Sequence, residues 1–124
     1  MLGHCAIIAF VSTTDALRSR QFYEGALGLR CVGDEPFALV LECQGTMLRV
    51  SKVEELVPAP FTVLGWRVAD LHSAVTELSV KGVVFERFPG MKQDDSGIWS
   101  SPGGALVAWF KDPDGNLLSL TQFG

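Results

Sequence analysis

The sequence is short of positive charge and has no basic patch. Lys and Arg together number 10 against 14 Asp and Glu, so the formal net charge of the 124 residues is −4. No run of five like charges occurs, and the basic residues are scattered along the chain. Proteins that bind nucleic acid or anionic membrane surfaces use clustered basic residues. We therefore expect no nucleic acid and no membrane among the partners.

The chain also lacks the patterns of export and membrane insertion. No apolar run approaches the ~18–20 residues needed to span a bilayer. The apolar stretch at residues 5–11 is short, and no basic region precedes it. Three cysteines, Cys5, Cys31 and Cys43, form an odd set without a C-x-x-C pair, which is typical of reduced thiols. These features predict a cytoplasmic protein.

Several catalytic signatures are missing as well. The sequence has no nucleophile elbow, no P-loop, no dinucleotide-binding glycine motif and no zinc-protease motif. What it does have is the length of one domain, with 48% hydrophobic and 19% charged residues. A chain of this kind can bury a substantial core without the help of disulfides or structural metal ions. We therefore expect a single domain over residues 1–124.

An internal repeat divides this domain. Residues 10–15 and 65–70 both read as an apolar strand ending in an aspartate, Asp15 or Asp70. The first helix is expected to begin at Thr14 or Asp15, either of which can cap it, and the second at Asp70. An amphipathic segment follows each aspartate and ends at a glycine, Gly28 or Gly82. The repeat predicts two β-α-β-β-β modules, about residues 1–57 and 58–124, joined by a stiff Pro-Ala-Pro segment.

The hydrophobic periodicity gives the expected elements and an α+β fold class. Strands are predicted at residues 6–11, 30–33, 37–43, 46–52, 61–68, 83–88, 105–110 and 116–122. A long polar loop at residues 89–104 is of a length that is often functional. The expected apolar stripes are Leu17, Phe22, Ala26 and Leu27 on the first helix, and Leu71, Ala74, Val75 and Leu78 on the second.

Two motifs inside this repeat carry a family resemblance. They are F-Y-x-x-x-L-G-L at residues 22–29 and the D-P-D-G-N turn at residues 112–116. In this order, around a duplicated β-α-β-β-β unit, they resemble the vicinal oxygen chelate superfamily, the group of glyoxalases, bleomycin-resistance proteins and dioxygenases. The resemblance covers nearly the whole chain. It implies two curled mixed sheets that form an open cup, and it implies a homodimer.

The resemblance also implies where a metal would bind. Metal-using members hold a divalent ion with His, Gln or Glu side chains from the first and last strands of each module. The matching positions here are Ile8 and Val63 in the first strands and Arg49 and Ser119 in the last strands. Two hydrocarbons, a permanent cation and a neutral hydroxyl are not a ligand set for such an ion. We therefore predict no metal and no other cofactor.

The same positions read as the lining of a small-molecule pocket. Strand alternation places further apolar and polar side chains on their faces, and an apolar lining with few polar groups is typical of ligand sites. Trp99, beside Ile98 in the long loop, must pack on a pocket rim or a partner. The predicted ligand-binding residues are Phe10, Met47, Arg49, Phe61, Arg67, Trp99, Ser119 and Thr121.

Arg49 has two interpretations. Its planar guanidinium suits an anionic or carbonyl group of a ligand. Alternatively it forms an internal ion pair, for which Glu42, Glu54 and Glu55 are the candidate partners.

Three functions remain open. The first is a metal-free binding protein, similar to bleomycin-resistance proteins, for a small apolar or aromatic ligand that can carry an anionic group. The second is a glyoxalase-type lyase or isomerase, or a dioxygenase, with a non-standard metal site or metal-free acid–base chemistry, for which Glu42, Asp94, Asp95 and the cysteines offer the candidate bases. The third is a purely structural partner module.

Overall fold

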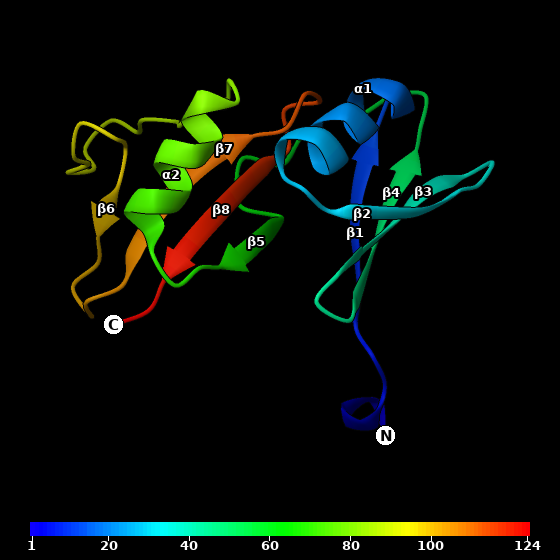
Figure 1. Ribbon diagram of the computed structural model, residues 1–124, viewed down its shortest axis with the longest axis horizontal. Coiled ribbons are helices and arrows are strands. Elements are labelled where there is room, and N and C mark those ends of the chain that lie inside the picture. The colour runs from blue at the N-terminus through cyan, green and yellow to red at the C-terminus, as the bar shows by residue number, and fades with distance from the viewer. The chain divides into compact units, whose positions relative to one another are not determined.

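The computed structural model describes residues 1–124 and contains two four-stranded mixed sheets (Figure 1). Internal contacts divide the chain into two compact units, Met1–Val57 and Pro58–Gly124, each holding one sheet. In each unit the strand order places the first strand beside the last, and these two strands run parallel. Two mixed sheets with few helices confirm the predicted α+β class.

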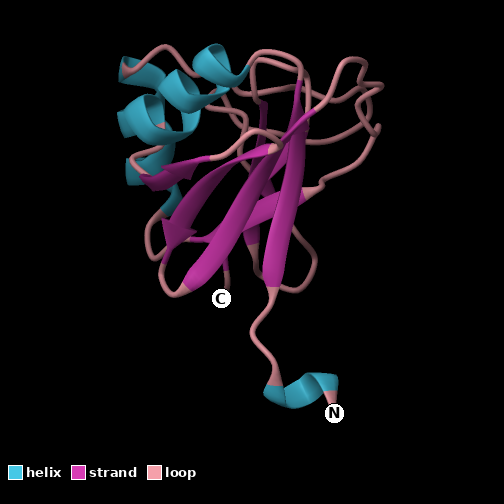
Figure 2. Cartoon of the chain, turned by 90° about the vertical axis from the view of Figure 1, so that its right-hand side faces the viewer, coloured by secondary structure: helices cyan, strands magenta, loops and turns pink.

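The first unit has the sheet order β1-β4-β3-β2. Strand β1 pairs in parallel with β4, and the two other pairs are antiparallel. A short N-terminal 3₁₀ helix extends beyond the start of β1 (Figure 2). The elements are η1 (Leu2–His4), β1 (Ile8–Thr13), α1 (Ala16–Arg20), η2 (Gln21–Ala26), β2 (Arg30–Asp34), β3 (Ala38–Cys43) and β4 (Thr46–Lys52).

The helix of the first unit begins where its cap predicts, but it buries other residues than expected. The Asp15 carboxylate accepts a hydrogen bond from the Arg18 backbone N–H at 3.1 Å, as an N-cap does. From Gln21 the helix continues as a π-helix, in which bonds span five residues and the buried face rotates. Ser19 of α1 and Tyr23 of the π-helix are the buried residues of this segment. The predicted stripe is wrong for Leu17, whose exposed fraction is 69%.

The second unit has the sheet order β5-β8-β7-β6. Its helix begins at the predicted cap, because the Asp70 carboxylate accepts hydrogen bonds from the Ser73 N–H and hydroxyl. Gly82, at a φ of +91°, lies just beyond the helix in the left-handed conformation that favours glycine. The elements are β5 (Leu64–Arg67), α2 (Leu71–Val80), β6 (Trp99–Ser100), β7 (Leu106–Lys111) and β8 (Leu117–Gln122).

Each unit has its core between the helix and one face of the sheet. In the second unit Phe110 is fully buried, stacked on Trp66 and packed against Phe85. Leu71 and Val75 of α2 are buried with it, as predicted for the apolar stripe of that helix. Because consecutive side chains of a strand point to opposite faces, the neighbours of these buried strand residues lie on the face that the helix does not cover.

Among the differences from the predicted elements, β1 is shifted by two residues, and the stretch predicted as a loop at residues 89–104 contains the short strand β6. Residues 83–88 make only one bridge, Phe85 to Phe110, next to which the Glu86 N–H bonds to the Trp109 carbonyl. The Glu86 carbonyl and the Phe88 N–H bond to the Gln93 side chain. Strand β5 begins only at Leu64, so residues 61–63 lie outside it.

Neither the ten residues of α2 nor any other helix combines the length and apolar character needed to cross a bilayer.

Candidate ligand-binding faces

The face of the second sheet that lies opposite α2 carries most of the predicted ligand-binding residues of that unit. The register pairs Gly65 with Ser119 and Arg67 with Thr121 across β5 and β8. Directly opposite residues share a face, so Trp109, the partner of Ser119 on β7, belongs to it as well. The same argument adds Trp99, since it pairs with Val107 and Val107 pairs with Thr121.

Three aromatic rings meet on this face, and we call them the aromatic face: Phe88, Trp99 and Trp109. The ring centroids of Trp99 and Trp109 are 6.1 Å apart and the rings are tilted by 41°. Phe88 meets Trp109 edge to face, with centroids 5.4 Å apart. Neither tryptophan is fully buried. Aromatic surfaces that remain partly accessible can accept a further ring in the same stacked or edge-to-face arrangements.

Polar groups border the aromatic face. The Arg67 guanidinium lies 5.1 Å above the Phe123 ring, which holds the cation while Arg67 stays exposed. A Cβ built on Gly65 would approach the Ser119 hydroxyl to 2.8 Å, so glycine is needed there for Ser119 to occupy its position. Ser119 itself is largely buried.

The face of the first sheet opposite its helix is more apolar and more exposed. Phe10 pairs with Arg49, and Ile8 pairs with Met47, across β1 and β4. Ile8, Phe10 and Met47 have exposed fractions of 47%, 57% and 40%, which is high for large apolar side chains on strands. The structure therefore places Phe10, Met47 and Arg49 together on one face, as the strand alternation predicts.

Arg49 forms an ion pair within its own unit. Its Nη2 donates to the Glu35 carboxylate at 3.0 Å, and the Arg49 side chain is about a quarter exposed. The predicted partners Glu42, Glu54 and Glu55 are therefore wrong. The Glu42 carboxylate instead accepts from the Gly45 N–H at 2.7 Å in the β3–β4 turn.

The neighbouring charges of β2 and β4 are also paired. Lys52 donates to the carboxylate of Asp34 and to the backbone carbonyl of Glu35. The hydrogen bond from Lys52 lowers the pKa of the Asp34 carboxyl. Acidic and basic side chains at this edge thus neutralise one another.

The residues at the four implied metal-ligand positions do not fit a divalent ion. The two units are equivalent there, because Ile8 pairs with Met47 two residues before Arg49, and the Val63 N–H donates to Leu117 two residues before Ser119. This equivalence of the two units supports the alignment of Ile8 with Val63 and of Arg49 with Ser119. None of the four side chains offers an imidazole or a carboxylate.

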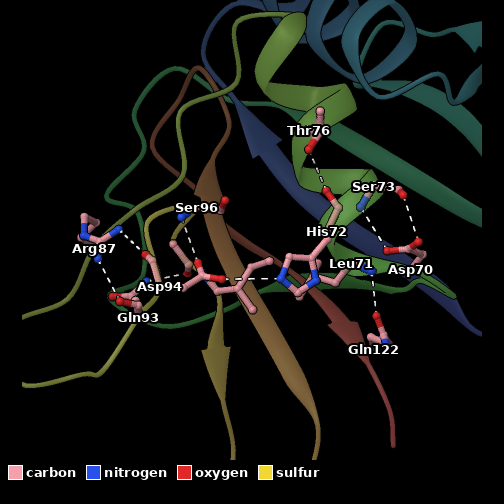
Figure 3. A network of polar contacts seen from close by, with 12 residues as sticks. Asp70, Leu71, His72, Ser73, Thr76, Arg87, Gln93, Asp94, Ser96 and Gln122 are labelled. Atoms are coloured by element: carbon pink, nitrogen blue, oxygen red, sulfur yellow. Dashed lines mark hydrogen bonds and ion pairs between the residues drawn. The ribbon is translucent and has the colours of Figure 1, made fainter.

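No alternative ligand cluster replaces them. The structure contains no group of three or more His, Cys, Asp and Glu side chains that could hold a metal ion. His72 lies on α2 and faces Asp94, with Nε2 and Oδ2 3.6 Å apart (Figure 3).

Sequence reasoning misplaced one site residue and missed two. Phe61 lies before β5, so strand alternation does not assign it to a face, and 63% of it is exposed. Trp109 and Phe88 belong to the aromatic face but were not among the predicted site residues. The alternation of Trp109 with Phe110 in β7 was the available signal for the first, whereas nothing local indicates the second.

Comparisons with known proteins agree with the resemblance. The profile of the Glyoxalase/Bleomycin resistance protein/Dioxygenase superfamily matches residues 1–120. No curated protein matches the chain.

Solved structures with this fold include proteins of different described roles. Lactoylglutathione lyase from Agrobacterium tumefaciens has a TM-score of 0.74 and 16% identity, covering 96% of this chain and 93% of its own. TnmS3, an antibiotic-binding protein from Streptomyces sp. CB03234, has a TM-score of 0.72 and 24% identity, covering 96% and 95%. A glyoxalase/bleomycin resistance protein/dioxygenase from Alicyclobacillus acidocaldarius has a TM-score of 0.72 and 16% identity, covering 97% and 92%. From the profile match over nearly its whole length, the chain belongs to the glyoxalase/bleomycin resistance protein/dioxygenase superfamily.

Proposed function

We propose that this protein binds a small aromatic or apolar molecule without the help of a metal ion. The observation that carries the proposal is the aromatic face, where Trp99 and Trp109 remain partly accessible beside Phe88. A ligand ring stacked on these side chains would gain both area burial and aromatic pairing. The unsuitable donors at Ile8, Arg49, Val63 and Ser119 support binding that needs no divalent ion.

The polar side chains beside the aromatic face indicate that the ligand also has an anionic group. Arg67 is exposed next to Thr121 on the same face, and its guanidinium can bind a carboxylate, sulfonate or phosphate through paired hydrogen bonds. Arg49 can do the same only if the ligand competes with Glu35 for it. The ligand chemistry that fits best is therefore a flat ring system with one anionic group.

Location and assembly belong to the same proposal. Cys5, Cys31 and Cys43 are all free, which supports a reducing compartment such as the cytoplasm. The superfamily resemblance supports a homodimer. The antibiotic-binding role described for TnmS3, a protein of the same fold, is consistent with a binding rather than a catalytic function.

The glyoxalase-type alternative has less support from the candidate bases. Glu42 and Asp94 both accept backbone N–H hydrogen bonds within their own turns, through Oε1 of Glu42 and Oδ1 of Asp94, so each carboxylate has a structural role. The fold alone favours this alternative, because a lactoylglutathione lyase shares it.

A fluorescence titration tests the proposal. Protein stripped of metal and kept in EDTA is titrated with 1-anilinonaphthalene-8-sulfonate, an anionic aromatic probe, and the protein concentration is varied to fix the stoichiometry. We expect saturable binding of one probe per chain, with quenching of tryptophan emission. Binding that appears only after a divalent ion is added would instead favour the metal-dependent alternative.

A further inference from the structure

The side chain of Gln93 ties together the two arms of the loop that supplies the aromatic face. Its Oε1 accepts from the Phe88 N–H at 2.8 Å. Its Nε2 donates to the Glu86 carbonyl at 2.9 Å and to the Gly97 carbonyl at 2.8 Å. The Gln93 amide thus bonds to the backbone of Phe88 and to that of Gly97, which lies two residues before Trp99.

The side chains of Arg87 and Asp94 also form hydrogen bonds with the backbone of this loop (Figure 3). The Arg87 guanidinium donates to the carbonyl oxygens of Asp94 and Gln93 at 2.8 and 3.1 Å. The Asp94 carboxylate accepts from the N–H groups of Ser96 and Ile98 and also faces His72 of α2. These contacts fix the tip of the loop, whereas the Gln93 amide bonds to the backbone of both arms, at Glu86 and Phe88 and at Gly97.

The chemistry at this point requires an amide. The three partners of Gln93 are one backbone donor and two backbone acceptors. A carboxylate could accept from Phe88 but would face two carbonyl oxygens, and an apolar side chain would leave all three groups without this partner. The site is also tight, since a Cβ built on Gly97 would approach the Phe85 Cβ to 3.3 Å.

We propose that Gln93 is a positioning residue for ligand binding: it sets the distance between Phe88 and Trp99 so that both rings close on Trp109. This rests on the proposed function, in which the aromatic face holds the ligand. Gln93 does not need to touch the ligand. Its contribution is to keep the three rings preorganised, so that binding does not have to order them.

The ring geometry can be tested without any ligand. Two tryptophans 6.1 Å apart and tilted by 41° couple electronically and give an exciton couplet in the far-ultraviolet circular dichroism. The Trp99→Phe variant removes the couplet and so identifies its contribution. We expect Gln93→Met, which keeps the volume but loses all three hydrogen bonds, to weaken or abolish the couplet while the chain stays folded.

The matched control is Gln122→Met. The Gln122 Oε1 also bonds to backbone, accepting from the Leu71 N–H at 2.8 Å, but it caps α2 and has no bond to the loop (Figure 3). This variant should lose stability and keep the couplet. A couplet that survives in Gln93→Met, or is lost equally in Gln122→Met, would overturn the proposal. If Gln93→Met does not fold, Gln93→Ala is measured under the same criteria.

Probe binding then separates this inference from the proposed function. If the loop of Gln93→Met holds the binding geometry only a tenth of the time, the Kd for 1-anilinonaphthalene-8-sulfonate rises about tenfold. Unchanged affinity in this variant would overturn the positioning role while leaving the binding function intact. Failure of the unaltered protein to bind the probe would count against the proposed function, and the couplet would still decide whether Gln93 positions the rings.

Discussion

Replacing one tryptophan on each face of the second sheet gives the sharpest separation between binding and folding. Trp109 lies on the aromatic face, with its ring 5.4 Å from Phe88 and 6.1 Å from Trp99. Trp66 lies in the same sheet on the helix side, where it stacks on Phe110 with centroids 6.4 Å apart. Trp109→Leu and Trp66→Leu therefore remove the same side chain from opposite faces of one sheet.

The expected magnitudes follow from these contacts. Each aromatic pair contributes about 0.5–1.5 kcal/mol beyond area burial, so both variants should lose folding stability by a similar order. An aromatic ligand that stacks on Trp109 loses one such pair in Trp109→Leu alone, which corresponds to a rise in Kd of roughly two- to tenfold. Trp66→Leu should leave the Kd unchanged.

The assay is a titration of each folded variant with 1-anilinonaphthalene-8-sulfonate in EDTA, with urea unfolding to match stability. Equal affinities for Trp109→Leu and the unaltered protein would refute the assignment of the aromatic face. Equal losses of affinity in both variants would show that the probe responds to general loosening of the unit.

Three further changes test other parts of the account. Phe110→Ala, which empties a fully buried position, should lower the free energy of unfolding by about 3–5 kcal/mol in urea. The hydrogen bonds from Ser73 hold the pKa of the Asp70 carboxyl below the usual value of an aspartate, so the cap stabilises the fold fully above that usual value and is lost as the pH falls through the lowered folded pKa. Asp70→Asn should flatten this acid dependence of the melting temperature, and an unchanged slope would contradict the role of the cap. Glu35→Gln frees Arg49 from its ion pair on the face of the first sheet, so binding of an anionic aromatic probe to that face should strengthen while binding of a neutral one does not; no difference would leave Arg49 as a structural residue.

Local chemistry made the helix starts and the succession of strands and helices along the chain predictable. Asp15 and Asp70 cap their helices because a carboxylate satisfies free N–H groups of the first turn whatever surrounds it. The repeat of strand, helix and strands in each half is a pattern of short range and predicts the two modules, whereas their mixed sheets were implied by the family resemblance. Cap and glycine positions were therefore predicted correctly.

Contacts set by register and by loop shape could not be predicted in the same way. Glu35 becomes the partner of Arg49 through the pairing of three strands, and no sequence spacing singles it out from the other glutamates. Phe88 meets Trp109 in a segment outside the regular strands, where the Glu86 N–H bonds to the Trp109 carbonyl and the Phe88 N–H bonds to the Gln93 amide. The π-helix at Gln21–Ala26 likewise rotates the buried face by an amount that hydrophobic periodicity does not reveal.

The central claim is that the four positions which the family resemblance assigns to metal ligands do not bind a divalent ion in this protein. Calorimetric titration of chelator-stripped protein with Ni²⁺, Zn²⁺, Mn²⁺ and Mg²⁺ tests it most directly. The side chains of Ile8, Arg49, Val63 and Ser119 predict no saturable binding of any of these ions at micromolar concentration. Tight binding of one ion per chain would contradict the account and would move the glyoxalase-type enzyme ahead of the binding protein.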